Sequence, residues 1–318
     1  MQVAFVGEAL IDFTGSPARP LAFQGHAGGS PLNAAVACAR LGVPTAYLTQ
    51  LSTDLFGEQL LGHLQANGID TSLVTRSSAP STLAFVERGD RTNRYAFFTT
   101  GSADAAWSPQ PVPRLPTTCR ALHFGSISLL REPGATAITA LVRAHAGRLI
   151  VVFDPNVRLG LIDDLPAYRE RFDTWRRLVT VLKLSDEDVA ALAPGGPPVE
   201  AAARWLRQGD EPGPSAVVVT QGGQGATLLR RGRPPMPVPA PAVTVRDTIG
   251  AGDTFGAALT VALLEAGVGT DADLQALDDA AWRAALEFAA AAAALNCERE
   301  GADPPDRSAV TAALAGRR

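Results

Sequence analysis

Short apolar runs alternate with helix-like stretches along most of the chain. Runs with the length and composition of buried strands lie near residues 3–8, 45–51, 121–124, 149–153, 180–184 and 215–220. Helices are predicted between them, at about residues 31–41, 55–67, 134–146, 167–177, 186–192, 199–208, 252–266 and 273–295. This order predicts an α/β protein with a mainly parallel sheet that is covered by helices on both faces.

Two regions interrupt the alternation. One is residues 12–25, and the other, about residues 81–100, contains two β-like runs around a polar turn at 88–91, which predicts a hairpin. Hairpins inserted into a parallel framework can form a small sheet over its ligand-binding edge. We therefore expect a single domain, 1–318, with a lid formed by these two regions. The Pro-rich stretch 234–241 is too short for a domain linker and is predicted to be an ordered connection.

Composition narrows the class of protein. With 46% hydrophobic and 19% charged residues, the chain is globular, and its net charge of −4 provides no basic surface for nucleic acid or an anionic membrane. No apolar run reaches membrane-spanning length, and the beginning of the chain lacks a signal-peptide pattern. Cys38, Cys119 and Cys297 lack metal-site spacing. These features predict a cytoplasmic protein without structural zinc that acts on a small polar substrate.

The most informative stretch is residues 247–256, which read Asp-Thr-Ile-Gly-Ala-Gly-Asp-Thr-Phe-Gly. Glycines before a helix let peptide N–H groups approach an anion closely, and the helix dipole favours its negative charge. Asp253 would compete with a bound anion unless it has a role of its own. The alternative is that this aspartate simply stabilises a first helical turn. The stretch is thus either an anion cradle with a working carboxylate or an ordinary capped turn.

Polar residues follow several predicted strands, at the sheet edge where open α/β proteins bind ligands. Asp12 could accept hydrogen bonds from sugar hydroxyls, or be a solvated loop carboxylate. Arg158 could bind a hydroxyl-rich or anionic ligand. The glycine pair 28–29 precedes a helix start that places Asn33 in the first turn, where it is either a polyol ligand or a capping residue.

Two further strand ends carry polar or glycine-rich strings. Lys183 precedes an acidic helix start that capping alone explains, and residues 220–225 read Thr-Gln-Gly-Gly-Gln-Gly. Those glycines permit close backbone approach to a ligand, although a plain β-turn has the same composition. The P-loop, the dinucleotide-binding fingerprint after the first strand and the Gly-x-Ser-x-Gly nucleophile elbow do not occur in the sequence. A P-loop enzyme, a standard dehydrogenase and a hydrolase of that kind are therefore disfavoured.

Two strings together resemble the signatures of the ribokinase-like (PfkB-type) carbohydrate kinase family. They are Gly-Gly-Ser-Pro-Leu-Asn at 28–33 and the late string at 247–253, in the family's order and separation. The resemblance covers essentially the whole chain and implies a three-layer α/β/α domain with a small β-sheet lid. It also implies ATP-dependent phosphorylation of a sugar hydroxyl. Within the family, the strings at 7–13, 124–126, 154–158 and 183–187 look most like bacterial fructokinases, which convert D-fructose to fructose 6-phosphate.

The resemblance implies roles for individual residues. Asp253 would take the proton from the attacking hydroxyl, while N–H groups stabilise the transferring phosphoryl group at Gly250, Ala251 and Gly252. The implied sugar-binding residues are Asp12, Gly28, Gly29, Asn33 and Arg158. The implied nucleotide-binding residues are Lys183, Ser185, Thr220, Gly222, Gly225 and Ala289.

Two ions accompany the nucleotide in the family. The resemblance implies Mg²⁺, organised indirectly by Asp188, and a monovalent cation, K⁺, held partly by main-chain carbonyls of the set Asp247, Ile249, Asn296, Arg299 and Gly301. Asp188 stands where the family motif has glutamate, so its reach is shorter. Many fructokinases carry Tyr-Arg after the lid strand, whereas residues 97–100 here read Phe-Phe-Thr-Thr. An arginine that would close over the sugar is therefore missing.

Other interpretations stay open. Because Arg158 could pair with the carboxylate of an acid sugar, 2-keto-3-deoxygluconate kinase is the second candidate, followed by kinases of ribose or nucleosides. A non-catalytic sugar or nucleotide sensor on the same fold is the candidate from a different class. Such a sensor is expected to lose the base, yet Asp253 and its glycines are intact. The family also implies a homodimer formed through the lid strands.

Overall fold

Apolar side chains on both faces of the central strands place these strands inside the molecule. In β10 (Ile150–Asp154), Ile150 and Val152 belong to one hydrophobic cluster, whereas Val151 and Phe153 belong to another. Successive side chains of a strand point to opposite faces, so a strand that is apolar at every position is buried on both. The two clusters are the two cores between three layers.

The computed structural model describes the chain except residues 17, 20, 88–93, 210 and 317–318. The other strands are β1 (Val3–Val6), β2 (Leu10–Gly15), β3 (Phe23–Gly28), β4 (Thr45–Leu48), β5 (Gln50–Ser52), β6 (Thr75–Ser77), β7 (Thr82–Glu87), β8 (Arg94–Phe98), β9 (Ala121–Gly125), β11 (Val181–Ser185), β12 (Ala216–Thr220), β13 (Ala226–Arg230) and β14 (Met236–Val238). The helices are α1 (Ser30–Arg40), α2 (Leu55–Ala66), α3 (Gly134–His145), α4 (Leu165–Arg176), α5 (Asp186–Leu192), α6 (Pro198–Ala203), α7 (Ala251–Glu265), α8 (Asp271–Ala276), α9 (Asp279–Cys297) and α10 (Arg307–Ala315).

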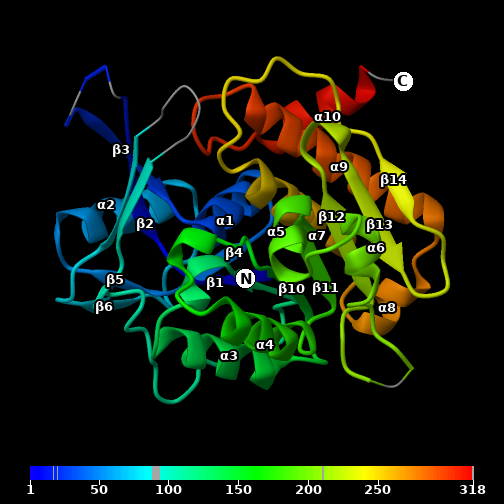
Figure 1. The fold of residues 1–318 in the computed structure, drawn as a ribbon, viewed down its shortest axis with the longest axis horizontal. Helices are drawn as coiled ribbons and strands as arrows, with labels where there is room; N and C mark the ends of the chain where they lie inside the picture. The colour runs from blue at the N-terminus through cyan, green and yellow to red at the C-terminus, as the bar shows by residue number, and fades with distance from the viewer. Residues whose placement is uncertain (17, 20, 88–93, 210, 317–318) are drawn as a thin grey trace.

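The large sheet confirms the predicted mainly parallel architecture. Its strand order is β14-β13-β12-β11-β10-β9-β1-β4. The strands from β4 to β12 in this order run parallel, and β13 and β14 extend the edge in antiparallel fashion. Helices α1, α7 and α9 cover one face, and α3 and α4 cover the other (Figure 1). The α/β/α layers put the carboxyl ends of the parallel strands at one common edge.

A separate four-stranded sheet stands beside the large one (Figure 1) and has the order β3-β2-β7-β8. Antiparallel pairing of β7 with β8 confirms the predicted hairpin strands, whereas the turn predicted at 88–91 lies outside the described residues. β2 pairs with β7 in parallel, for example at Asp12 and Ala84. The two regions that interrupt the α/β alternation in the sequence therefore meet in one small sheet.

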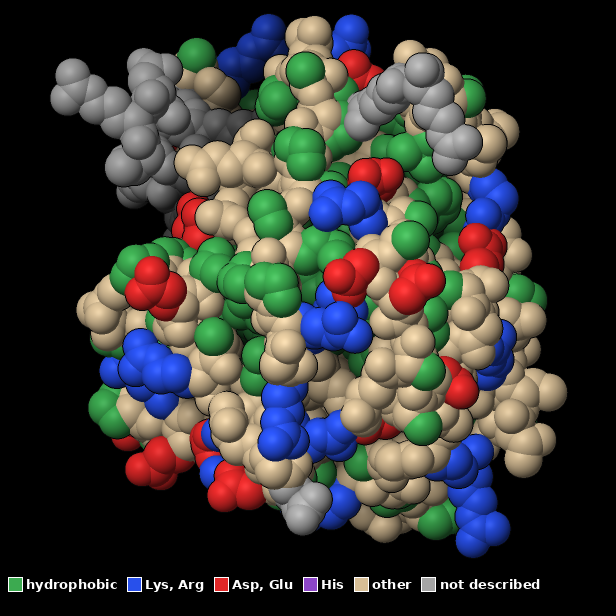
Figure 2. Space-filling model, turned by 90° about the vertical axis from the view of Figure 1, so that its right-hand side faces the viewer, with side chains coloured by type: hydrophobic (Ala, Val, Ile, Leu, Met, Phe, Trp, Pro, Cys, Tyr) green, Lys and Arg blue, Asp and Glu red, His purple; other side chains and the backbone are tan. Residues whose placement is uncertain are grey.

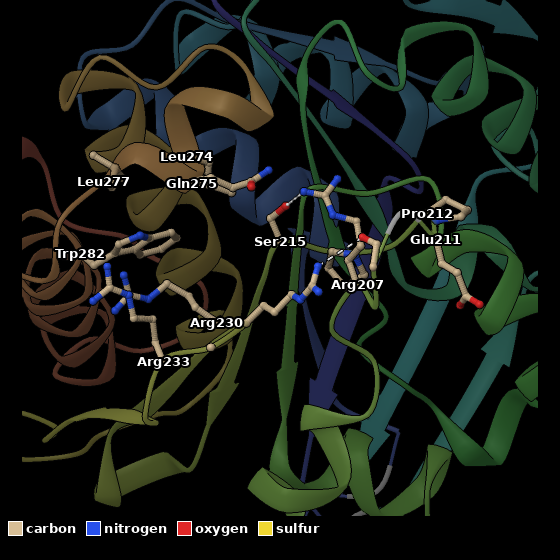
Figure 3. A pocket seen from close by; sticks show the side chains of 14 residues that line it. Arg207, Glu211, Pro212, Ser215, Arg230, Arg233, Leu274, Gln275, Leu277 and Trp282 are labelled. Carbon is tan, nitrogen blue, oxygen red and sulfur yellow. Dashed lines mark hydrogen bonds between the residues drawn. The ribbon is translucent and has the colours of Figure 1, made fainter.

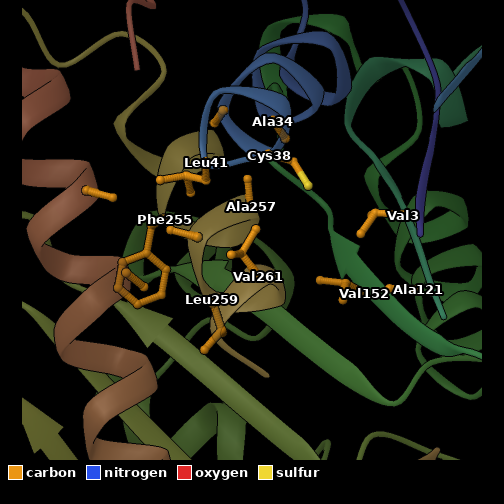
Figure 4. Packing of buried hydrophobic residues seen from close by; sticks show 14 of the residues in the cluster. Val3, Ala34, Cys38, Leu41, Ala121, Val152, Phe255, Ala257, Leu259 and Val261 are labelled. Carbon is orange, nitrogen blue, oxygen red and sulfur yellow. The ribbon is translucent and has the colours of Figure 1, made fainter. Parts of the chain in front are cut away.

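Small side chains let α1 and α7 pack closely over the large sheet. Figure 4 shows Ala34 and Cys38 of α1 together with Ala257 and Val261 of α7 in the core, and all four are fully buried. Close packing leaves little room for relative movement of two helices. This contact matters because both helices begin at the carboxyl edge of the sheet.

The structure corrects one predicted helix and shows a short strand within a predicted connection. The single helix predicted over 273–295 is wrong, because the chain forms α8 and then α9. Asp278 caps α9 by accepting a hydrogen bond from the Ala281 N–H at 2.7 Å, and a capped start does not interrupt an apolar period in the sequence. The Pro-rich connection contains β14, an edge strand that tolerates Pro237. Among the described helices, none combines enough length with enough apolar character to cross a lipid bilayer.

Candidate active site

Two glycines set the positions at which α1 and α7 begin. Gly29 precedes α1 with a φ of 108°, and Gly250 precedes α7 with a φ of 75° in the left-handed region. Both conformations favour glycine, and a Cβ at Gly29 would lie 2.8 Å from the Glu8 carbonyl oxygen. The two helix starts carry the two sequence signatures, so Asn33 and Asp253 come together in space.

Asp253 is held in place by α1. Its Oδ1 accepts a hydrogen bond from Ser30 Oγ at 2.7 Å, and its Oδ2 accepts one from Asn33 Nδ2 at 2.9 Å. Burial raises the pKa of this carboxyl above its usual value, although the two hydrogen bonds lower it, and the charge of Asp154 adds to the rise. A fixed carboxylate with a raised pKa has the properties of a general base.

Lys183 is the only lysine of the chain, and it is buried beside the glycine cradle. Its Nζ donates to Asp154 Oδ2 at 2.7 Å, and a Cβ at Gly252 would lie 3.0 Å from the same Nζ. Burial opposes the charged form, but the charge and hydrogen bond of Asp154 outweigh it and raise the pKa of Lys183. A fixed ammonium next to a helix N-terminus suits a phosphoryl group. Asp154 was not singled out from the sequence, where it reads as a turn residue.

Asp12 belongs to the same electrostatic environment. A Cβ at Gly28 would lie 2.1 Å from the Asp12 Oδ2, so only glycine at this position leaves room for the carboxylate. Burial raises the pKa of Asp12 to about 6, while the charge of Arg158 lowers it and that of Asp253 raises it. Arg158 is exposed and forms no ion pair with the residues that the structure describes. Asp12 thus lies within electrostatic reach of both Asp253 and Arg158.

The sequence reasoning missed Glu8, which lies two residues after β1. Its Oε1 accepts from the Ser30 N–H at 3.2 Å and its Oε2 from the Ser128 N–H at 3.1 Å. Burial raises the pKa of Glu8 to about 7. Glu8 therefore ties the start of α1, and with it the Ser30 hydroxyl on Asp253, to the turn after β9. The available signal was a second carboxylate in the strand-end string that contains Asp12.

The residues predicted on the nucleotide side lie at the ends of β11 and β12. Ser185 and Thr220 are register partners there, and Thr220 Oγ1 donates to the Leu184 carbonyl at 3.2 Å. Gly222 and Gly225 flank a tight turn with φ values of 53° and 101°. These positions share the carboxyl edge of the sheet with Lys183 and the glycine cradle.

Two predicted residues have surroundings that bear on the roles assigned to them. Ala289 of α9 has no exposed surface, so the predicted nucleotide contact is not supported. Both Asp188 carboxylate oxygens accept backbone hydrogen bonds, from the Val157 N–H at 2.6 Å and the Ser185 N–H at 2.8 Å. Asp188 therefore caps α5 and anchors the turn that carries Arg158. Its role toward Mg²⁺ stays a prediction.

Asp247 joins the two loops that were predicted to hold a monovalent cation. Its Oδ1 accepts from the Ile249 N–H at 3.1 Å, and its Oδ2 accepts from the Gly301 N–H at 3.0 Å. The side-chain amide of Asn296 donates to the Ile249 carbonyl at 2.8 Å. The main-chain carbonyl of Asn296 accepts from the Arg299 N–H. Carboxylate and main-chain carbonyl oxygens from two adjacent loops suit K⁺. The Asn296 side-chain amide therefore holds the loop that carries Ile249, and the role of Asn296 as a cation ligand stays a prediction.

The cation loops border the sugar side. A small cavity of about 30 Å³ is lined by Asp12, Gly28, Ile249 and Gly301. The guanidinium of Arg299 donates to the Pro304 carbonyl at 3.2 Å, so only the main-chain carbonyl of Arg299 remains as the predicted cation ligand. Within the described ranges, no group of three or more His, Cys, Asp or Glu is placed to hold a metal ion.

A helix N-terminus opened by glycines, a buried ammonium and a fixed carboxylate at one sheet edge define an α/β protein built for phosphoryl transfer. Comparison with known proteins agrees with this class. Residues 1–309 match the pfkB family of carbohydrate kinases, so the chain belongs to that family, as the sequence predicted.

Individual relatives cover nearly the whole chain. A fructokinase of Rhizobium leguminosarum bv. trifolii is 37% identical over 279 residues, which are 87% of this chain and 84% of that protein. The crystal structure of a Xylella fastidiosa fructokinase with bound ATP has a TM-score of 0.88 at 28% identity, covering 99% of this chain and 98% of that one. A fructokinase double mutant from Vibrio cholerae O395, in a form with bound fructose, ADP and potassium ion, has a TM-score of 0.83 at 25% identity, covering 98% of each chain.

Proposed function

We propose that this carbohydrate kinase transfers the γ-phosphoryl group of ATP to D-fructose and forms fructose 6-phosphate. The observation that carries the proposal is the double hydrogen bond that fixes Asp253 beside the cradle of residues 250–252. The choice of fructose rests on the relatives, which are named as fructokinases.

In the reaction we propose, Asp253 removes the proton from the attacking sugar hydroxyl. A hydroxyl is a weak nucleophile until it is deprotonated, and the raised pKa makes Asp253 a stronger base than a solvent-exposed aspartate. The hydroxyl oxygen bonds to the γ-phosphorus while the bond to the bridging oxygen breaks and ADP leaves. The N–H groups of residues 250–252 and the ammonium of Lys183 stabilise the charge on the phosphoryl oxygens during this transfer.

We assign sugar binding to Asp12, Gly28, Gly29, Asn33 and Arg158. Asn33 then has two tasks, because its amide N–H₂ orients Asp253 while its amide oxygen accepts from a sugar hydroxyl. The small sheet that carries Asp12 is proposed to act as a lid. Excluding water from the site would favour transfer to the sugar over hydrolysis of the nucleotide.

We assign the nucleotide to Lys183, Ser185, Thr220, Gly222 and Gly225, and K⁺ to the loops that Asp247 joins. Neighbouring structures with ATP, or with ADP and potassium, support a nucleotide and a metal ion here. Mg²⁺ bound with the ATP phosphates is part of the proposal. The cytoplasmic location and the homodimer stay predictions from the sequence.

The test is ADP release measured with ATP and separate acceptors. We expect the highest kcat/KM for fructose, compared with ribose, 2-keto-3-deoxygluconate and nucleosides. Phosphate at the 6-position of the product confirms the proposed attack. Turnover of none of these acceptors would overturn the kinase assignment, and a strong preference for another acceptor would overturn fructose alone.

One observation favours 2-keto-3-deoxygluconate as a second candidate substrate. Arg158 is exposed and is not in an ion pair with any described residue, so its guanidinium could bind a substrate carboxylate. A preference for this acid over neutral ketoses, lost in Arg158→Ala, would support that candidate. Equal loss for acid and neutral sugars would instead assign Arg158 to hydroxyl binding.

A further inference from the structure

A second and larger cavity lies away from the candidate active site. Its volume is about 760 Å³, and its walls come from the segment before β12, the turn between β13 and β14, and helices α8 and α9 (Figure 3). Ser215 lines the cavity and precedes β12, whereas Thr220 ends β12 at the active-site edge. The cavity therefore opens at the opposite edge of the large sheet. Its size is that of a small-molecule site, roughly 300–1,000 Å³.

Arginine side chains dominate its polar lining, at positions 207, 230, 231 and 233. Two of them have fixed positions. Arg207 donates to Asp271 and to Ser215, each at 2.7 Å, and Arg230 donates to Asp279 at 2.6 Å. These bonds hold two guanidinium groups at the wall of the cavity.

The other two arginines are not paired with a carboxylate of the described residues. Arg231 and Arg233 are exposed on the β13–β14 turn, and neither forms an ion pair within the part of the chain that the structure describes. Of the described residues that line the same cavity, Glu211 is the one with a carboxylate. Figure 2 shows basic side chains interspersed with acidic ones on the side of the molecule where β14 lies, and since the only lysine is buried, the basic ones are arginines.

Trp282 supplies an independent indication of a ligand. Its side chain lines the cavity and is 1% exposed, and its indole Nε1 has no hydrogen-bond partner among the described residues. The guanidinium carbon of Arg230 lies 5.9 Å from the centre of the ring. A buried donor without an acceptor is unfavourable, and a ligand that displaced the cavity wall beside the Trp282 Nε1 would bring an oxygen to it.

We propose that this cavity is a second anion site, which binds the phosphoryl group of a small phosphorylated compound or free phosphate through Arg231 and Arg233. A planar guanidinium pairs with two phosphate oxygens at once, and several arginines together match the double negative charge of one phosphate. Arg207 and Arg230, already neutralised by carboxylates, shape the walls. The site does not depend on the reaction proposed above, because binding there is measured directly.

The test is calorimetric titration of the full chain with inorganic phosphate and, separately, with fructose 6-phosphate. Both titrations are made with a non-hydrolysable ATP analogue and fructose at saturation, so that the glycine cradle is filled. We expect one equivalent to bind, and the Arg231→Ala/Arg233→Ala double variant to bind at least about tenfold more weakly. Arg143→Ala, which removes an exposed arginine of α3 outside this cavity, serves as the matched control and is expected to bind like the wild type.

The titrations also distinguish the sources of the phosphoryl group. Tighter binding of fructose 6-phosphate assigns the site to a sugar phosphate, and equal binding assigns it to the phosphoryl group alone. Unchanged affinity in the double variant, or no binding at millimolar concentration, overturns the proposal. If the double variant does not fold, the NMR signal of the Trp282 indole N–H decides, since it must shift when phosphate binds the wild type.

Discussion

At the scale of single residues, the candidate site is a set of buried carboxylates with different partners. Asp253 accepts from two side chains, Glu8 from two backbone N–H groups, and Asp154 pairs with Lys183. Burial alone would protonate such groups more readily. The hydrogen-bond partners determine which carboxylate can act as a base. Side-chain donors orient Asp253, whereas both carboxylate oxygens of Glu8 accept from backbone N–H groups.

Replacing Asp253 with asparagine is expected to lower kcat about 10²–10⁴-fold, because the amide cannot take a proton. Sugar affinity, measured by calorimetry, should stay near that of the wild type. Near-normal turnover in Asp253→Asn would remove Asp253 from the role of base.

Ser30→Ala is the companion variant, since it removes one hydrogen bond that lowers the pKa of Asp253. Ser30→Ala should lower kcat less than Asp253→Asn does. The acid limb of its pH–rate profile should lie at higher pH than in the wild type.

Sugar binding is expected to weaken in acid because of Asp12. Its pKa is raised to about 6, and below that pH the protonated carboxyl loses acceptor capacity for a sugar hydroxyl. The KM for the sugar should therefore rise as the pH falls through about 6. The stability of the fold depends on pH in the opposite direction. A carboxyl with a raised pKa stabilises the folded state at low pH, and this contribution to the free energy of unfolding is lost as the pH rises through 6. Asp12→Asn, which does not titrate, should show a high KM that stays level with pH.

At the scale of elements, caps and glycines determine where helices begin, and the helix starts carry the chemistry. Gly29 and Gly250 start α1 and α7, and both helices were predicted within one or two residues. Asp54 caps α2 through the Gly57 N–H at 2.8 Å, and α2 begins at Leu55, where the sequence predicted a helix start. The break between α8 and α9 was missed, because a capping aspartate is equally compatible with the exposed face of a continuous helix.

Asp278→Ala should therefore destabilise the fold by about 1 kcal/mol, the usual cost of losing an N-cap. The measurement is the midpoint of urea unfolding, with an unchanged m-value. Asp163→Ala is the matched control, because Asp163 is 94% exposed and makes only a long ion pair, 3.8 Å, with Arg131. A surface change of this kind is expected to stay within about 0.5 kcal/mol, and an equal effect of both variants would argue against the capping role.

At the scale of the whole molecule, contacts between distant segments assemble the site. Asp247 links the loop before α7 to the loop after α9, and the cavity beside it reaches the small sheet. The small sheet and these two loops thus meet around one cavity. With K⁺ at the proposed position, such an arrangement would couple ion binding to the position of the cradle.

Replacing K⁺ with an organic cation is accordingly expected to lower kcat/KM, because the loop that precedes Gly250 loses its ion. Asp247→Asn should reduce both the rate in K⁺ and its dependence on K⁺, measured as ADP release at constant ionic strength. A rate that is the same with and without K⁺ in the wild type would contradict the cation site. Asp163→Asn, which removes an exposed carboxylate outside these loops, is the control and should keep the K⁺ dependence.

The sequence by itself determined the alternation of strands and helices, the hairpin strands and the family, because periodicity and the two glycine-rich strings are local properties of the chain. Tertiary structure alone decided what each polar residue touches. Ser30 and Asp253 are 223 residues apart in the chain yet share a hydrogen bond, and Lys183 finds Asp154 only through the pairing of adjacent strands. Burial, which sets the pKa values of Glu8, Asp12 and Asp253, likewise depends on packing that no local pattern contains. The site's residue types were therefore readable in advance, whereas their division of labour had to be seen in three dimensions.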